Sequence, residues 1–318
     1  MEFRRAGMRG ESMKTADGQA PFKSGYVALV GAPNVGKSTL LNQLLKEKVS
    51  ITAPKPQTTR NRISGILNRP DCQIILMDTP GIHKARDPFN QIMVDTALGT
   101  LGEVDIICVI IDAVSASGEI DEMIRERLAR LSTPIVLLLN KVDLVRNKGD
   151  LLPMLQQLGE KWDCHAIIPI SALSGDGVNL LLDELMALLP EGPRYFPEDY
   201  LTDQPERFLV AELVREKVFR LVHQEIPYAV AITVDRFGED AERRRIEIEA
   251  TIHVERDSQK GIIIGKKGQM LREIGKQARL DIETLLGCHV YLGLYVRVQK
   301  NWRKDPRARA DFGYRPHG

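Results

Sequence analysis

The sequence contains no long apolar run. Its uninterrupted apolar stretches all fall short of the roughly eighteen residues that a helix needs to cross a bilayer, so a membrane-spanning helix is excluded. The first 24 residues include two early arginines but neither an apolar segment nor the small-residue cleavage site that follows one in a secretory signal. We therefore predict that residues 1–24 are a disordered leader.

Cysteine is also scarce. The four cysteines are scattered along 318 residues and form no CxxC pair. Cys108 lies within the apolar run DIICVII and is predicted to be a reduced, buried core residue. The isolated histidines, His83 among them, lack the spacing of metal ligands and are interpreted as surface or core residues. This pattern predicts a reducing, cytoplasmic location.

Charge is distributed unevenly. The formal net charge is only +1, yet residues 258–310 contain twelve Lys or Arg and four Asp or Glu. This local excess predicts a face that binds a polyanion, although a solvated basic surface is the usual alternative. Residues 189–207 contain four prolines and no apolar periodicity, which is typical of a linker. A chain of 318 residues is long enough for two domains, one on each side of that linker.

Short apolar runs alternate with amphipathic stretches before the linker. The runs that we predict to be strands lie at 26–30, 73–77, 105–111, 134–139 and 166–170. Nearly continuous apolar strands that alternate with helices predict an α/β domain with a mostly parallel sheet, covered by helices on both faces.

The segment GAPNVGKS at residues 31–38 follows the first apolar run and precedes an amphipathic stretch. A glycine-bearing turn between a strand and a helix directs several backbone N–H groups at one point, which makes a polyphosphate site. Lys37 would reach the terminal phosphates, and the Ser38 hydroxyl would ligate magnesium. The candidate phosphate-binding residues are Gly31, Asn34, Val35, Gly36, Lys37, Ser38, Thr39 and, from the next motif, Gly81.

Three weaker motifs follow later strands. In DTPG (78–81), Asp78 could hold magnesium through water and the Gly81 N–H could sense the third phosphate. In NKVD (140–143), the Asp143 carboxylate could accept two hydrogen bonds from guanine, whereas adenine offers no such donor pair. A backbone N–H in ISALSGDG could reach the guanine oxygen. The candidate guanine-binding residues are Asn140, Lys141, Asp143, Ser171 and Ala172.

These four motifs, each at the end of its own strand, resemble those of the translation-factor-related GTPases. The resemblance implies GTP hydrolysis with Mg²⁺ held by Ser38, Asp78 and a switch threonine. The run PQTTR (56–60) resembles the first switch of these GTPases, and Thr59 is favoured over Thr58 because related proteins place the threonine just before the arginine. A plain solvent loop is the alternative for both threonines.

Catalysis differs from that of the small signalling GTPases. Those proteins orient the attacking water with a glutamine soon after the switch glycine, whereas here Gly81 is followed by Ile82. Water must then be placed by backbone groups, by a partner or with the help of a monovalent cation, and no general base is named. Asn34 matches the asparagine with which such GTPases hold potassium, so K⁺ is a second expected cofactor. Turnover is expected to be slow, roughly 10⁻⁴ to 10⁻² per second.

After the linker, the pattern predicts the order helix, strand, strand, helix, helix, strand. The two consecutive helices flank Gly265-Lys266-Lys267-Gly268. Glycines in such a turn let a nucleic-acid backbone approach closely, and the helix N-terminus attracts phosphate. A GxxG turn alone is usually a simple connector, but this order and the basic excess favour the single-strand clamp of an α+β, type II KH domain. Trp302 and the basic run after it could stack on bases or contact phosphate, or could belong to a solvated tail.

One GTPase domain followed by one KH domain is similar to the Era family. The resemblance implies a GTP-binding and slowly GTP-hydrolysing switch that binds the 3′ end of small-subunit (16S) ribosomal RNA and assists assembly of the 30S subunit. It also implies peripheral association with the inner face of the cell membrane; a monomer is expected. The predicted parts are the leader (1–24), the GTPase domain (25–190), the linker (191–206), the KH domain (207–305) and a C-terminal tail (306–318).

Three rival functions remain open. A regulatory GTPase could use the KH-like domain to bind a protein partner. An RNA chaperone could bind RNA without regard to the nucleotide. An ATPase is the weakest of the three, because the guanine motifs would then have no role.

Overall fold

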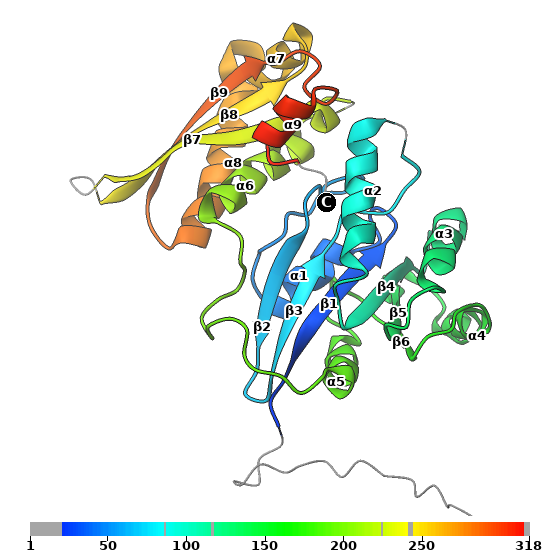
Figure 1. Ribbon diagram of the computed structural model, residues 1–318. Coiled ribbons are helices and arrows are strands. Elements are labelled where there is room, and N and C mark those ends of the chain that lie inside the picture. The colour runs from blue at the N-terminus through cyan, green and yellow to red at the C-terminus, as the bar shows by residue number, and fades with distance from the viewer. Residues whose placement is uncertain (1–20, 86, 116–117, 224, 241–243, 315–318) are drawn as a thin grey trace, which may run out of the picture.

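The computed structural model describes residues 21–314, apart from residues 86, 116–117, 224 and 241–243. Most of the predicted leader lies outside the described residues. Its last two residues, Lys23 and Ser24, already belong to the first strand, because they pair in register with Cys72 and Gln73. The described chain forms two units joined by residues 189–205 (Figure 1).

The first unit is built around a six-stranded sheet with the order β2-β3-β1-β4-β5-β6. β2 runs antiparallel to β3, and all other neighbours are parallel, which confirms the predicted mostly parallel sheet. Sequence analysis missed β2, because Ser and Gly interrupt its apolar pattern. The strands are β1 (Lys23–Gly31), β2 (Ile63–Asn68), β3 (Cys72–Asp78), β4 (Ile106–Asp112), β5 (Ile135–Asn140) and β6 (Ala166–Pro169).

Helices cover both faces of this sheet (Figure 1). Val27 and Leu29 of β1 share a core cluster with residues of α1 and α5, whereas Ala28 and Val30 share another with residues of α2, α3 and α4. Successive side chains of a strand point to opposite faces, so burial on both faces explains the unbroken apolar run. The helices are α1 (Lys37–Leu45), α2 (Pro88–Thr100), α3 (Gly118–Leu128), α4 (Leu151–Lys161) and α5 (Val178–Leu188), and 3-10 turns cover Val142–Leu144 and Lys148–Asp150.

The second unit has a three-stranded sheet with the order β7-β8-β9, and its core lies between this sheet and α6, α7 and α8. β7 and β8 are antiparallel, whereas β8 and β9 are parallel. The predicted element order is confirmed, and a 3-10 turn precedes the first strand. The elements are α6 (Glu206–Leu221), the 3-10 turn Pro227–Ala229, β7 (Ala231–Asp240), β8 (Arg245–Val254), α7 (Asp257–Ile264), the 3-10 turn Lys266–Gly268, α8 (Gln269–Leu286), β9 (Val290–Val298) and α9 (Pro306–Asp311).

The segment between the units is bound along the edge strand β2. The backbone N–H of Ile66 donates to the Leu201 carbonyl at 2.8 Å, and the Thr202 hydroxyl donates to the Ser64 carbonyl at 2.6 Å. The side chain of Gln73 also bonds to the backbone of Tyr195 and Phe196. The prolines prevent this segment from forming a regular strand. Its other backbone and side-chain polar groups still bond to the edge of the sheet, which would otherwise be unpaired.

Trp302 packs at the junction of the two units and is fully buried. Its Nε1 donates to the Ala229 carbonyl at 2.9 Å, and its ring lies 5.3 Å from that of Phe89 on α2 and 5.7 Å from that of Tyr314. The predicted roles for Trp302, base stacking or a place in a solvated tail, are therefore wrong. Helix α9 and Tyr314 pack with it, so the aromatic side chains serve the junction.

Among the described residues, no helix is long and apolar enough to cross a membrane.

Candidate nucleotide site and nucleic-acid interface

The phosphate loop lies where β1 ends and α1 begins. Gly36 has a φ of +106°, and a Cβ atom there would lie 2.3 Å from Nδ2 of Asn140, so only glycine fits. Lys37 is buried, and its Nζ donates to the carbonyls of Gly31 (3.1 Å) and Ala32 (2.8 Å). Burial lowers the pKa of Lys37 to about 8, although the nearby Asp78 opposes the shift. A bound polyphosphate would supply the anion that this buried ammonium lacks.

Three hydroxyl side chains converge on Asp78. Oδ2 of Asp78 accepts hydrogen bonds from Ser38 (2.6 Å) and Ser50 (2.7 Å), and the Thr59 hydroxyl lies 2.8 Å from that of Ser38. Burial raises the pKa of Asp78, although Ser38, Lys37 and Ser50 oppose the rise. Its buried Oδ1 has no hydrogen-bond partner among the described residues. A buried carboxylate oxygen beside two hydroxyls is an oxygen ligand set that fits Mg²⁺.

Thr58 and Thr59 have different surroundings. Thr58 donates to the Lys55 carbonyl at 2.7 Å, within its own turn, whereas Thr59 joins the group around Asp78. This geometry agrees with the preference for Thr59.

A cavity of about 540 Å³ opens beside these groups. Gly81 closes one wall, since a Cβ atom there would lie 2.7 Å from Cα of Pro33. Ile82 is buried, and its N–H donates to the Gly31 carbonyl at 3.0 Å. The cavity is lined by residues of the phosphate loop and α1 (Ala32–Thr39), of the segment before the first switch (Ile51–Pro54), of the switch itself (Gln57–Thr59), and by Gly81, Asp112, Ser115 and Lys141.

The predicted guanine motifs meet at the ends of β5 and β6. The Asn140 side chain donates to the Val35 carbonyl (2.6 Å) and accepts from the Ala172 N–H (2.9 Å), so it ties the phosphate loop to the loop after β6. Lys141 pairs with Asp112 at 2.7 Å and lines the cavity. Asp143 is exposed.

The predicted backbone donors of the loop after β6 are occupied. The Ser171 N–H donates to the Asp176 carbonyl at 3.0 Å, and the Ala172 N–H donates to Asn140. In the described part of the chain the Leu173 N–H has no acceptor, and its side chain is exposed. Leu173 is therefore a further candidate for contact with the base; it lies in the ISALSGDG motif, but only Ser171 and Ala172 were predicted from that motif.

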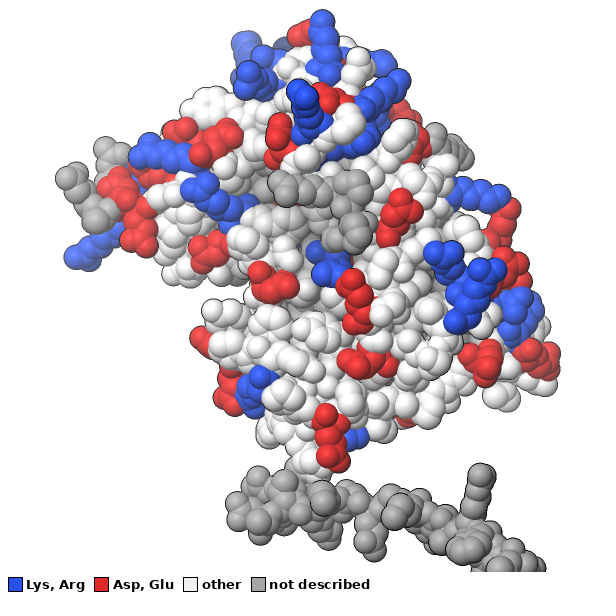
Figure 2. All heavy atoms as spheres, in the orientation of Figure 1, with Lys and Arg blue, Asp and Glu red and all other residues white. Residues whose placement is uncertain are grey.

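The GKKG turn lies in the second unit, between α7 and α8. Gly265, Lys267 and Gly268 all have positive φ, of 71°, 52° and 75°. Lys266 and Lys267 are exposed, and α8 begins directly after Gly268, so its first N–H groups face the turn. Figure 2 shows Lys and Arg side chains gathered at the top of this unit, near α7 in Figure 1.

A groove of about 400 Å³ continues from this turn along α8 and β9. Leu271, Leu292 and Leu294 provide apolar surface, and exposed basic side chains of α8 line the same groove. An apolar floor with a basic rim suits the bases and phosphates of a single strand. Sequence reasoning missed these residues, although the spacing of the basic positions along one helix could have indicated them: Arg272, Lys276 and Arg279.

Comparison with known proteins agrees with this division. Residues 26–141 match the model of the family described as 50S ribosome-binding GTPase, and residues 225–303 match that of the KH domain. GTPase Era of Syntrophus aciditrophicus (strain SB) is 53% identical over 293 residues, which cover 92% of this chain and 95% of that protein. The chain belongs to the Era family of GTPases. The resemblance inferred from the motifs is thereby confirmed.

Other members of the Era family extend the similarity. GTPase Era of Geobacter metallireducens is 51% identical over 92% of this chain and 98% of its own. A crystal structure of Era in complex with MgGDPNP and nucleotides 1506–1542 of 16S ribosomal RNA has a TM-score of 0.90 and 43% identity, over 92% of this chain and 99% of that one. A variant of Aquifex aeolicus Era bound to GDP·AlF4⁻ also has a TM-score of 0.90, with 42% identity, over 92% of this chain and 100% of that one.

Proposed function

We propose that this protein is a GTP-binding and slowly GTP-hydrolysing switch, which binds the 3′ end of small-subunit ribosomal RNA and assists maturation of the small subunit. The observation that carries the proposal is the pairing, in one chain, of a phosphate-loop cavity lined by buried polar side chains with an exposed, basic GxxG groove. The Era structure that holds both MgGDPNP and 16S ribosomal RNA supports this reading for a close relative. We assign GTP binding to residues 25–190 and RNA binding to residues 207–305.

Mg²⁺ would be held by Ser38, Thr59 and Asp78. When bound, it would neutralise charge on the terminal phosphates and polarise them for attack. The free Oδ1 of Asp78 and the hydroxyls beside it are already assembled, so this chain would supply the ligands without rearrangement of β3.

K⁺ is a second proposed cofactor, close to Asn34. The Asn34 backbone is left-handed (φ of +63°), and its Nδ2 lies 3.4 Å from the Pro54 carbonyl, so its side chain bridges the phosphate loop and the segment before the first switch. Hydrolysis should be faster in potassium than in sodium salts of equal ionic strength. Equal rates in the two salts would remove K⁺ from the mechanism.

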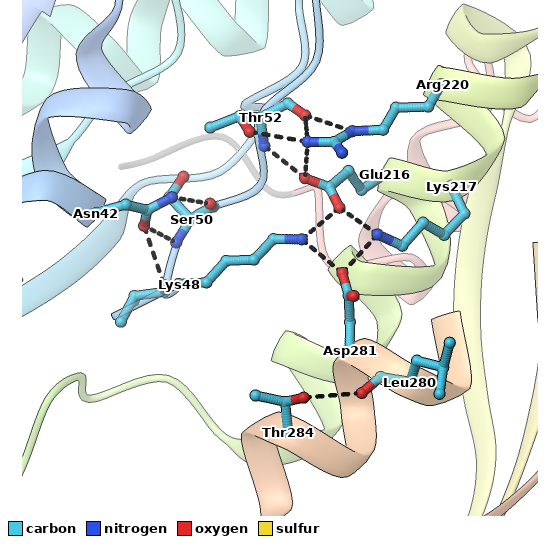
Figure 3. A network of polar contacts seen from close by, with 11 residues as sticks. Asn42, Lys48, Ser50, Thr52, Glu216, Lys217, Arg220, Leu280, Asp281 and Thr284 are labelled. Atoms are coloured by element: carbon cyan, nitrogen blue, oxygen red, sulfur yellow. Dashed lines mark hydrogen bonds and ion pairs between the residues drawn. The ribbon is translucent and has the colours of Figure 1, made fainter. Parts of the chain in front are cut away.

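The segment just before the first switch is bonded to the second unit, which would couple the two sites. The Thr52 N–H donates to Oε1 of Glu216 at 3.0 Å, and Arg220 donates to the Thr52 carbonyl at 2.9 Å (Figure 3). Two residues earlier, the Ser50 hydroxyl donates to Asp78. One short segment therefore contacts both the proposed metal ligand and helix α6.

An ion cluster continues this contact to α8. Lys48 bonds to Glu216 and to Asp281 at 2.6 Å each, and Lys217 also bonds to both carboxylates (Figure 3). The side chain of Glu216 is fully buried. Burial alone would raise the pKa of Glu216, but hydrogen bonds from Lys48, Thr52 and Lys217 outweigh it and hold that pKa below its ordinary value. Asp281 lies on the helix that begins at the GKKG turn, so the cluster joins the segment before the first switch to the RNA clamp.

Arg60 makes a second contact between the first switch and the second unit. It is buried, and its guanidinium donates to the carbonyls of Val230 (2.6 Å) and Pro227 (3.0 Å). The rings of Phe89 and Phe219 lie 5.4 and 5.5 Å from its central carbon. Release of the first switch after hydrolysis would break these contacts together, and thereby change the position of the second unit.

We also propose a cytoplasmic monomer that acts on the 30S subunit and associates peripherally with the inner face of the membrane. The four unpaired cysteines support a cytoplasmic location, where thiols stay reduced. The basic surface of the second unit supports contact with the RNA of the 30S subunit and with the membrane surface.

The test compares RNA affinity in two nucleotide states. A labelled RNA with the sequence of the 16S 3′ end, and a scrambled RNA of equal length, are titrated with protein loaded with a non-hydrolysable GTP analogue or with GDP. We expect tight binding of the first RNA with the analogue only. By linkage, that RNA must tighten GTP binding by the same factor. Equal affinities in both states would contradict the switch, and equal affinities for both RNAs would favour a protein partner for the KH domain.

A further inference from the structure

Gln57 and His83 form a contact at the edge of the nucleotide cavity that has no role in the function proposed above. Gln57 lies in the first switch and lines the cavity. Its Nε2 is 3.2 Å from Nε2 of His83, whose Nδ1 is 2.7 Å from the Gly81 carbonyl oxygen. The imidazole thus joins the first switch to the glycine that faces the phosphate loop.

Hydrogen-bond chemistry fixes the donors in this contact. The Gly81 carbonyl can only accept, so Nδ1 of His83 carries the hydrogen, and the carboxamide nitrogen of Gln57 can only donate, so Nε2 of His83 is the acceptor. The imidazole therefore holds the nitrogen of Gln57. No donor from the described residues bonds to the Oε1 of Gln57, which is left as an acceptor at the cavity.

The backbone at Gln57 supports a specific role. Its φ of +59° lies in the left-handed region, which is unfavourable for residues other than glycine. Thr58 stabilises this turn through its hydrogen bond to the Lys55 carbonyl. Strained backbone that the surroundings hold in place is characteristic of functional sites.

We propose that Gln57 is a catalytic residue whose Oε1 accepts a hydrogen bond from the attacking water, and that His83 is the positioning residue that orients it. The inference rests on the proposed GTPase function and names a residue for a step that Ile82 cannot perform, because Ile82 is apolar and buried. In that step the water oxygen bonds to the terminal phosphorus, the bond to the bridging oxygen of GDP breaks, and the water proton ends on the released phosphate.

The test measures single-turnover hydrolysis and binding for Gln57→Ala, His83→Ala, His83→Gln and the exposed control Gln91→Ala, with Mg²⁺ and K⁺ present. Gln57→Ala should lower the rate by roughly tenfold or more, with unchanged affinity for a non-hydrolysable GTP analogue. Its affinity for GDP with aluminium fluoride, which imitates the transferring phosphate, should fall by a similar factor. His83→Ala should lower the rate as much as Gln57→Ala does. The double variant Gln57→Ala/His83→Ala should be no slower than either single variant. His83→Gln keeps an acceptor for the Gln57 amide and should recover most of the rate.

The outcomes separate this inference from the function on which it rests. Wild-type protein that hydrolyses GTP, beside a Gln57→Ala variant with the same rate, would overturn the role of Gln57 and leave the GTPase function intact. Equal losses of GTP-analogue affinity and rate would mean a structural role and would also overturn it. Wild-type protein that fails to hydrolyse GTP would overturn both. Thermal melting of each variant identifies loss of folding. If a variant does not fold, recovery of the rate in His83→Gln supports the assigned roles of Gln57 and His83, and no recovery contradicts them.

Discussion

Lys37 and Lys267 are both adjacent to a glycine with positive φ at the start of a helix, yet their surroundings are opposite. A Cβ atom on Gly36 would lie 2.3 Å from Asn140, whereas one on Gly268 would meet no atom within 4 Å. Lys37 is buried and bonded to two carbonyls, and Lys267 is exposed. The same local arrangement therefore buries its lysine in one unit and exposes it in the other.

The difference suits the two ligands. A nucleotide is small, so its site can use buried polar groups such as Asp78. Such a group is costly to leave unpaired, so it favours the ligand that pairs with it. An RNA strand runs past the protein, so its site must stay open and depends on exposed charge and on close approach of the backbone. Buried polar groups should make the first site more sensitive to mutation than the second.

Removal of the buried cation should have the largest effect. Lys37→Ala should lower GTP affinity by at least roughly a hundredfold, or about 3 kcal/mol, because a charge-assisted bond from a buried ammonium to phosphate is lost. RNA affinity without nucleotide should not change. Calorimetric titration with a GTP analogue measures the nucleotide affinity. Lys161→Ala, at an exposed position, is the control. A loss of less than fivefold would show that the first site is as tolerant as the second.

A carboxylate in the open turn should have the next largest effect. Gly268→Asp meets no neighbouring atom, so the protein should fold, although its positive φ makes the backbone somewhat less favourable. The added negative charge should lower RNA affinity by about tenfold or more and leave GTP affinity unchanged. Fluorescence anisotropy with labelled RNA measures this.

Gly268→Ala, which adds no charge, is the matched control and should lose much less RNA affinity. Gly265→Ala, in contrast, should destabilise the fold, because its Cβ atom would lie 2.7 Å from the Cβ atom of Met270. Equal losses for the Asp and Ala variants at position 268 would contradict the electrostatic explanation.

A change at the junction should affect neither site alone, but only their coupling. Glu216→Gln removes the buried charge that Lys48 and Lys217 share, so the ratio of RNA affinities in the GTP and GDP states should fall by a few fold. In the absence of RNA, the affinities for GTP and for GDP should stay the same. Glu206→Gln, exposed on the same helix, is the control. An unchanged ratio would assign the coupling to Arg60 instead.

Acid should produce the smallest effect. The pKa values of Glu216 and Asp281 are held below their ordinary values by Lys48 and Lys217, despite the opposing effect of burial. Their contribution to stability is therefore complete above the ordinary Glu value of 4.5 and is lost as pH falls through the lowered pKa values. Calorimetric unfolding should show little change in this contribution between pH 7 and pH 5. Glu216→Gln should differ from the wild type less at pH 3 than at pH 7.

Several site residues could be predicted because their motifs lie at strand ends. Asp78 and Asn140 each close a buried apolar strand, so a parallel sheet brings them to one edge. Leu173 could not be predicted, because its free N–H depends on how Asn140 and Asp176 occupy the neighbouring donors. Trp302 was misread because a basic, polar neighbourhood in sequence does not indicate burial against a distant helix.

The sequence by itself determined the element order of the second unit, the parallel part of the first sheet and the positions of the phosphate loop and GKKG turn. These features depend on local periodicity and on glycines, which act within a few residues. Only the tertiary structure decided the junction, where Lys48 meets Glu216 and Asp281, 168 and 233 residues away. Such pairs depend on how two finished surfaces dock, because a charged side chain carries no local mark of the partner that it will meet.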